Sequence, residues 1–331
     1  MFEPSLLKIF RGMPASKQAG SAALSLAERY RGVMLGVAVG NILGLPAEGS
    51  WKGSLLHRFP TGLRDPDPAE AHRPWDDDLA QTVLLAESLL DGGPLNLDDL
   101  AERLLKWARE NGRGMGNLTW RALNELAHGT PPVEAGLWVW IEDGRGPAGN
   151  GAVMRCAPIS LRWRHDIRRL VEESLRSALV THFDPRCQWS AVAFNLALAY
   201  CLEGMAMDVT ALADALDEAG APSVVGDAIR VVKGASLEAL DLDEEHAKGY
   251  TLKAMQVGLW ALNQTIGFEN TLVAVVNEAG DTDTNGAVVG AAAGALYGDR
   301  AIPERWLVCV NERERLEGLA DRLLEASQQE L

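Results

Sequence analysis

Apolar side chains recur at helical intervals along most of the chain. Leucine and alanine repeat at i, i+3, i+7, i+8 and i+11 from Leu97 to Ala108, and a similar stripe runs from Leu316 to Leu324. Because such a stripe lies along one face of an α-helix, the pattern predicts two amphipathic surface helices. Further helices are expected at 22–44, 78–90, 118–128, 168–180, 187–203, 208–218, 248–264, 268–279 and 284–297, separated by breaks that contain Gly or Pro.

Alternating apolar and polar positions, which mark half-buried strands, are scarce. The nearest candidate is VEAGLWVWIED at 133–143, a single short apolar run that is too little to build a sheet. Residues 1–21 are expected to form a loosely ordered N-terminal arm, and residues 63–74 a surface loop. With no repeat period and no low-complexity linker, residues 22–331 are predicted to form one all-α domain.

Two of the expected helices carry glycine at every fourth position. Glycines at this spacing share one helical face, where a neighbouring backbone can approach closely. We therefore expect the two helices to pack in the core with little side chain between them. The two arrays are Gly32, Gly36, Gly40 and Gly44, and Gly286, Gly290, Gly294 and Gly298.

The charge balance restricts the classes of partner. The chain has 331 residues, 47% hydrophobic, and a formal net charge of −15. Nucleic acids and anionic membranes are therefore not expected as partners, since both attract clustered cations. A phosphate-bearing small molecule is still compatible, because metal ions held by acidic side chains reverse the local field.

The cysteines and the N-terminus indicate no special compartment. The four cysteines are far apart and lack C-x-x-C spacing, which argues against structural zinc and redox motifs. The N-terminus lacks an apolar stretch of signal-peptide length, and no uncharged segment reaches the roughly 20 residues needed to span a bilayer. We expect a cytoplasmic protein.

Two acidic clusters precede expected helices. DTDTNG (281–286) offers four capping side chains where one suffices, and Asp76, Asp77 and Asp78 are consecutive carboxylates. DTDTNG resembles an EF-hand start, but the twelfth position of such a loop would be Ala292 rather than Glu. For either cluster alone, helix capping and binding of a hard cation both remain open. Two clusters of the same kind favour a shared metal site.

A third segment, GRGPAGNGAVMR (144–155), combines a Gly-Asn-Gly turn with a helix start. Such a turn exposes backbone N–H groups to an anion. It matches neither a Walker loop nor the dinucleotide fingerprint, so by itself the turn predicts little.

Taken in order, five segments resemble the ADP-ribosylglycohydrolase family over about residues 28–300. They are RGVMLGVAVGNILGLPAEG, PWDDDLAQTV, GNGAVMRCAPI, THFDP and GDTDTNGAVVGAAAGA. The resemblance implies a single orthogonal helical bundle and a site for two Mg²⁺ or Mn²⁺ ions. It also implies hydrolysis of the bond between ADP-ribose and its acceptor, an arginine or serine side chain of a protein or a small molecule.

The resemblance assigns roles to particular residues. Glu48 matches the acidic residue that gates the site or transfers a proton, and Asp77 and Asp78 join it as catalytic residues. The residues that match the ADP-ribose groove are Gly149, Asn150, Gly151, Met154, Arg155 and His182. The metal ligands implied are Asp76, Asp77, Asp78, Asp281, Asp283 and Thr284.

Two positions depart from the family pattern. Asp76 and Leu79 stand where the family has threonine, so one oxygen ligand is lost at Leu79 and a carboxylate replaces a hydroxyl at Asp76. The alternatives are therefore a non-catalytic member that binds ADP-ribose or serves structurally, and a hydrolase of another nucleoside or glycoside. The acceptor, the preferred metal and the oligomeric state are left open by the sequence.

Overall fold

Helices make up nearly all of the regular structure in the computed structural model, which describes residues 10, 13, 15–17 and 24–329. In the first half they are α2 (Leu26–Gly44), α3 (Lys52–Arg58), α4 (Asp77–Leu90), α5 (Leu97–Glu110), α6 (Asn117–Ala127), α7 (Pro132–Glu142), α8 (Gly151–Met154), α9 (Ala157–Trp163) and α10 (Ile167–Leu179). In the second half they are α11 (Pro185–Leu202), α12 (Val209–Glu218), α13 (Ser223–Val231), α14 (Thr251–Ala261), α15 (Phe268–Val276), α16 (Thr282–Tyr297), α17 (Glu304–Leu307) and α18 (Arg313–Gln328). The prediction of an all-α fold is confirmed.

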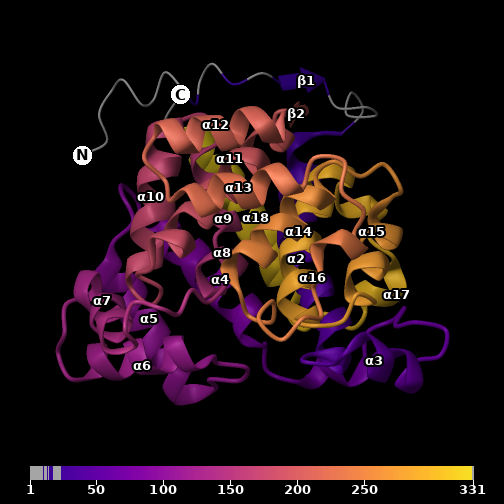
Figure 1. Cartoon of the computed structure of the whole chain (residues 1–331), viewed down its shortest axis with the longest axis horizontal. Helices are drawn as coiled ribbons and strands as arrows, with labels where there is room; N and C mark the ends of the chain where they lie inside the picture. Colours follow the sequence, from indigo (N-terminus) through magenta and orange to yellow (C-terminus); the bar gives the residue numbers. More distant parts are fainter. Residues whose placement is uncertain (1–9, 11–12, 14, 18–23, 330–331) are drawn as a thin grey trace.

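Short elements complete the described chain. Four 3-10 helices are η2 (Leu45–Ala47), η3 (Pro68–His72), η4 (Glu238–Leu240) and η5 (Asp299–Ala301). Strands β1 (Ala15–Lys17) and β2 (Met205–Met207) pair antiparallel, with Ser16 opposite Ala206. They lie at one edge of the helical body, beside α12 (Figure 1).

The pair α2 and α16 lies within the helical body (Figure 1), and the two helices run antiparallel with their backbones in contact along their length. A Cβ atom added at Gly36 would lie 2.0 Å from the carbonyl oxygen of Gly290, and one at Gly40 would lie 1.9 Å from that of Gly286. No side chain fits at such distances. The expectation that the two glycine arrays pack against each other is confirmed, and nearly every residue of both helices is buried.

Capping side chains fix several helix starts. Ser25 and Glu28 form a capping box at the start of α2, and Asp184 accepts a hydrogen bond from the Arg186 N–H at the start of α11. Because these caps satisfy N–H groups that have no partner within the helix, they set where each helix begins. The two acidic clusters behave differently, as described below.

The segment VEAGLWVWIED forms most of α7 and contributes to no sheet. Pro132 occupies the first helical turn, where its missing N–H costs nothing. Ala135, Gly136 and Val139 face the core while Trp138 is about half exposed. The helical pattern does not predict α3, α9 or α13 either, because each has only seven to nine residues and so few turns over which a period can show.

Most of the expected N-terminal arm (1–21) lies outside the described residues. Within it, Phe10 is buried and residues 15–17 form β1. None of the described helices has the length and apolar character needed to cross a bilayer.

Candidate functional site

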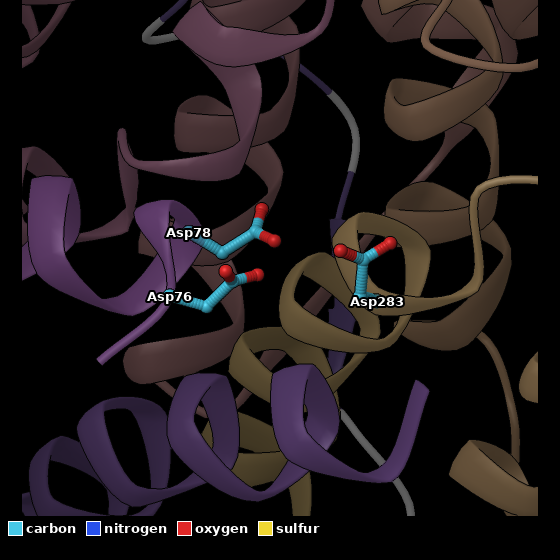
Figure 2. A group of neighbouring side chains, drawn as sticks. All are labelled: Asp76, Asp78 and Asp283. Atoms are coloured by element: carbon cyan, nitrogen blue, oxygen red, sulfur yellow. The ribbon is translucent and has the colours of Figure 1, made fainter. Parts of the chain in front are cut away.

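Three aspartates from two helices meet at the heart of the site. Asp76 and Asp78 come from the start of α4, and Asp283 comes from the first turn of α16. Their carboxylates point toward one another (Figure 2), and one oxygen of each lies within 4.8 Å of the others. All three side chains are buried. We call this group the aspartate triad.

The triad has oxygen atoms that the described protein leaves unsatisfied. Asn41 in α2 donates to Asp78 at 3.0 Å and more weakly to Asp76 at 3.4 Å. Among the described residues, Asp78 Oδ1, Asp283 Oδ1 and Asn41 Oδ1 are buried without a hydrogen-bond partner. Buried oxygens of this kind are costly unless something neutralises them. An all-oxygen donor set fits a hard cation such as Mg²⁺ or Mn²⁺.

Asp76 does not cap its helix. Its backbone occupies the N-cap position of α4, but its side chain accepts no capping hydrogen bond. The carboxylate instead faces the triad, where Arg113 Nε lies 3.7 Å away. Asp281, at the N-cap of α16, also makes no capping bond; it accepts hydrogen bonds from Asn150 Nδ2 at 2.7 Å and the Gly249 N–H at 3.0 Å. Capping therefore does not explain the excess of acids at either helix start.

Burial and mutual repulsion raise the pKa values of these carboxyl groups. Burial is the main reason that the pKa values of Asp78 and Asp283 lie well above the usual range, and neighbouring carboxylates add to it. The pKa of Asp77 is raised well above its usual range by burial and then by Asp76 and Asp281. Such a concentration of negative charge favours a bound cation.

Glu48 stands just after η2 at the mouth of the site. Much of its side chain is exposed. Partial burial of its carboxyl group, followed by repulsion from Asp281 and Asp76, nevertheless raises its pKa. Glu48 therefore retains its proton to a higher pH than an isolated glutamate.

A cleft of about 270 Å³ opens in front of the triad. It brings together residues that the sequence singled out: Glu48, Asp77, Gly149, Asn150, Gly151, Met154, His182, Asp281, Asp283 and Thr284. Asp76 and Asp78 are not part of its lining and stand behind it, where Thr284 Oγ1 lies 3.5 Å from Asp78 Oδ2. Leu79, the second departure from the family pattern, is buried in the hydrophobic core.

The sequence did not indicate one wall of the cleft. Gly114, Gly116, Asn117, Leu118 and Thr119 line it, together with Gly249. A Cβ atom at Gly114 would lie 2.3 Å from Asp76 Oδ1, so only glycine allows this loop to cover the triad. The stretch GRGMGNLT, with three glycines in five residues, was the available signal.

Arg155 lies behind the cleft rather than in it. Its side chain is completely buried. Its guanidinium donates to Gln81 Oε1 at 2.7 Å, to the Ser177 carbonyl at 3.1 Å and to Thr181 Oγ1 at 2.7 Å. No direct contact with a molecule in the cleft is therefore open to Arg155 in this arrangement.

Comparison with known proteins points to one family. Residues 22–331 match the family model described as ADP-ribosylglycohydrolase. The chain is 28% identical to "ADP-ribosylarginine hydrolase Tri1" of Serratia proteamaculans, covering 89% of this chain and 79% of that protein. It is 30% identical to "ADP-ribosyl-[dinitrogen reductase] glycohydrolase" of Rhodospirillum rubrum, covering 86% and 90% of the two chains. A solved structure titled "ADP-ribosylglycohydrolase-related protein complex" superposes with a TM-score of 0.72 at 32% identity, covering 91% and 99%.

Proposed function

The chain belongs to the ADP-ribosylglycohydrolase family of hydrolases, and from that premise we propose that it cleaves the glycosidic bond between ADP-ribose and its acceptor with the help of two Mg²⁺ or Mn²⁺ ions. The observation that carries the proposal is the aspartate triad, with unsatisfied buried oxygens at the inner end of a cleft. Buried carboxylates beside a cleft support a cation site with room for a ligand next to it.

The proposed metal ligands come from the starts of both α4 and α16. Asp76, Asp78, Asp283 and Thr284 would hold one cation, and Asp77 and Asp281, which line the cleft, would complete the second site. Bound divalent cations supply Lewis acidity toward ribose hydroxyls and lower the pKa of a coordinated water. Leu79 provides no ligand, and the carboxylate of Asp76 replaces the oxygen that a threonine would offer.

The residues of this chain then orient the substrate and move protons. The Gly149–Gly151 turn faces the cleft and leaves room for a ligand close to the backbone. Glu48, at the mouth and with a raised pKa, is placed to donate a proton to the leaving group or to hold a water that does so. A carboxyl group tuned upward by burial and like charges is suited to general acid catalysis near neutral pH.

The acceptor is proposed to be an arginine side chain. The Serratia relative is named for ADP-ribosylarginine, and the Rhodospirillum relative for ADP-ribosylated dinitrogen reductase. Serine-linked and small-molecule conjugates are the competing substrates. An ADP-ribosylated protein or small conjugate is thus the proposed partner, and a cytoplasmic location remains a proposal.

A direct assay tests the activity and the acceptor together. The protein is incubated with ADP-ribosylarginine peptide, ADP-ribosylserine peptide and ADP-ribosylated nucleotides, each with Mg²⁺, Mn²⁺ or chelator, and released ADP-ribose is measured by mass spectrometry. We expect release from the arginine peptide only with metal. Asp283→Asn is the matched inactive variant. Binding of ADP-ribose without release from any substrate would instead establish a non-catalytic family member.

A further inference from the structure

A chain of buried hydrogen bonds runs from the acidic site to the opposite wall of the cleft. Gln81 Nε2 lies 3.4 Å from Asp77 Oδ2, and Gln81 Oε1 accepts from Arg155 at 2.7 Å. Arg155 donates at 2.7 Å to Thr181 Oγ1, which lies 2.8 Å from His182 Nδ1. His182 lines the cleft. Arg155 and Thr181 thus connect a cleft residue to the interior.

The hydrogen-bonding needs of Thr181 favour one position for the proton of the imidazole. A guanidinium only donates, so Thr181 Oγ1 accepts from Arg155. Among the described residues, the only other partner of this hydroxyl is His182 Nδ1. If Nδ1–H donated to the oxygen, the buried hydroxyl hydrogen would have no acceptor, so we infer that the hydroxyl donates to Nδ1. Nδ1 is then an acceptor, and a neutral ring must carry its hydrogen on Nε2.

The other edge of the ring faces the glycine turn and the cleft. A Cβ atom at Gly149 would lie 3.0 Å from His182 Nε2, and one at Gly151 would lie 2.4 Å from Cε1. Both glycines are therefore needed for the turn to pass this close to the imidazole. No hydrogen-bond partner of Nε2 occurs in the described part of the chain, so an Nε2–H group is available to a molecule in the cleft.

We propose that Arg155 and Thr181 are positioning residues that hold His182 as the Nε2–H tautomer, so that the cleft wall presents a neutral N–H donor to a ligand oxygen. The identity of the ligand rests on the proposed function: the accepting atom is a phosphate oxygen of ADP-ribose. The arrangement places the positive charge of Arg155 behind the wall and the donor at its surface.

The electrostatics agree with this geometry. Burial and then the charge of Arg155 lower the pKa of His182 to about 3, so the ring is neutral across the physiological range. Burial lowers the pKa of Arg155 to about 10, which leaves it charged at neutral pH. His182 therefore acts through an N–H dipole, and the adjacent buried cation adds attraction for an anion.

Nitrogen NMR of the histidine rings in the metal-loaded protein tests the proposal without a substrate. The His182 signal is assigned by its loss in His182→Asn. We expect a protonated Nε2 and an unprotonated Nδ1 in the wild type and in Thr181→Ser. In Thr181→Val we expect a mixture of the two tautomers. Arg155→Gln should also give a mixture and should let His182 titrate at a higher pH.

Calorimetric titration with ADP-ribose supplies the second measurement. Thr181→Val should bind ADP-ribose about tenfold more weakly, as expected for one lost hydrogen bond, while Thr181→Ser stays within about twofold. Thr271→Val is the matched control, because it removes a buried hydroxyl of α15 that, among the described residues, bonds only to the carbonyl of Gly267 just before that helix. Mn²⁺ affinity should be unchanged in all three variants.

The outcomes separate this inference from the proposed function. Protonated Nδ1 in the wild type overturns the positioning role, as does an unchanged tautomer in both Thr181→Val and Arg155→Gln. Unchanged ADP-ribose affinity in Thr181→Val overturns the donor role. Failure of the wild type to bind ADP-ribose overturns the proposed function, and the tautomer measurement then still decides what Arg155 and Thr181 do.

Discussion

Gly40→Ala tests whether the contact between α2 and α16 sets the geometry of the aspartate triad. The added Cβ would lie 1.9 Å from the Gly286 carbonyl oxygen, whereas an ordinary contact begins at 3.4 Å, a shortfall of 1.5 Å. Backbone lies on both sides of this contact, so no side chain can move aside. The start of α16 must shift away from α2, and Asp283 lies only three residues before Gly286.

The expected magnitude follows from two opposing effects. Overpacking of a core costs about 1–3 kcal/mol, and rigid backbone atoms place this substitution at the upper end. The higher helix propensity of alanine returns about 1 kcal/mol. We therefore expect the free energy of unfolding to fall by about 2 kcal/mol. Displacement of Asp283 should weaken Mn²⁺ binding about 10- to 100-fold, the range seen when a supporting residue of a metal site is lost.

Urea denaturation of the chelator-treated protein and calorimetric titration with Mn²⁺ measure the two effects. Gly318→Ala in α18 is the control, because a Cβ there has no neighbour within 4 Å, and it should stabilise the protein by up to about 1 kcal/mol. If the free energy of unfolding of Gly40→Ala is within about 0.5 kcal/mol of the wild-type value, the backbone contact does not restrict this position as proposed. Lost stability with unchanged Mn²⁺ affinity would show that this contact does not position the triad.

Three further predictions concern the acidic residues. Glu48→Gln should slow turnover about 10²- to 10⁴-fold while ADP-ribose affinity stays within a few-fold, measured by release assay and calorimetry; unchanged turnover with metal bound would remove Glu48 from the chemistry. Asp76→Thr should weaken Mn²⁺ binding yet retain activity at saturating metal, and one shared affinity for wild type, Asp76→Thr and Asp76→Ala would show that Asp76 is not a ligand. The pKa values of Asp78 and Asp283 are raised in the folded state, so the folded state holds protons that the unfolded state releases. The free energy of unfolding of the metal-free protein should therefore fall as pH rises above 3.8, the pKa in the unfolded state, toward the raised pKa values of the folded state. Asp283→Asn should reduce this loss and raise the melting temperature of chelator-treated protein at pH 7.5, and a lower melting temperature than the wild type there would contradict the argument.

Local sequence signals determined much of the fold. The 3.6-residue period predicts the long helices, and glycine at every fourth position predicts the backbone contact of α2 with α16, because both depend only on spacing along one helix. The pattern does not predict α7, because its apolar period is unclear. This helix packs Gly136 against the turn at Thr181, a contact that depends on residues distant in the sequence.

The sequence by itself also determined that acidic residues gather at two helix starts and that a Gly-Asn-Gly turn is available for a ligand. Only the tertiary structure decided which acids meet: Asp76 and Asp78 turn inward to Asp283, while Asp77 and Asp281 face the cleft with Glu48. It likewise placed Arg155 behind His182 and the 114–119 loop over the site. The physical reason is that the direction of a side chain at a helix start depends on where the helix begins and what it packs against, and those contacts join residues between 32 and 206 positions apart.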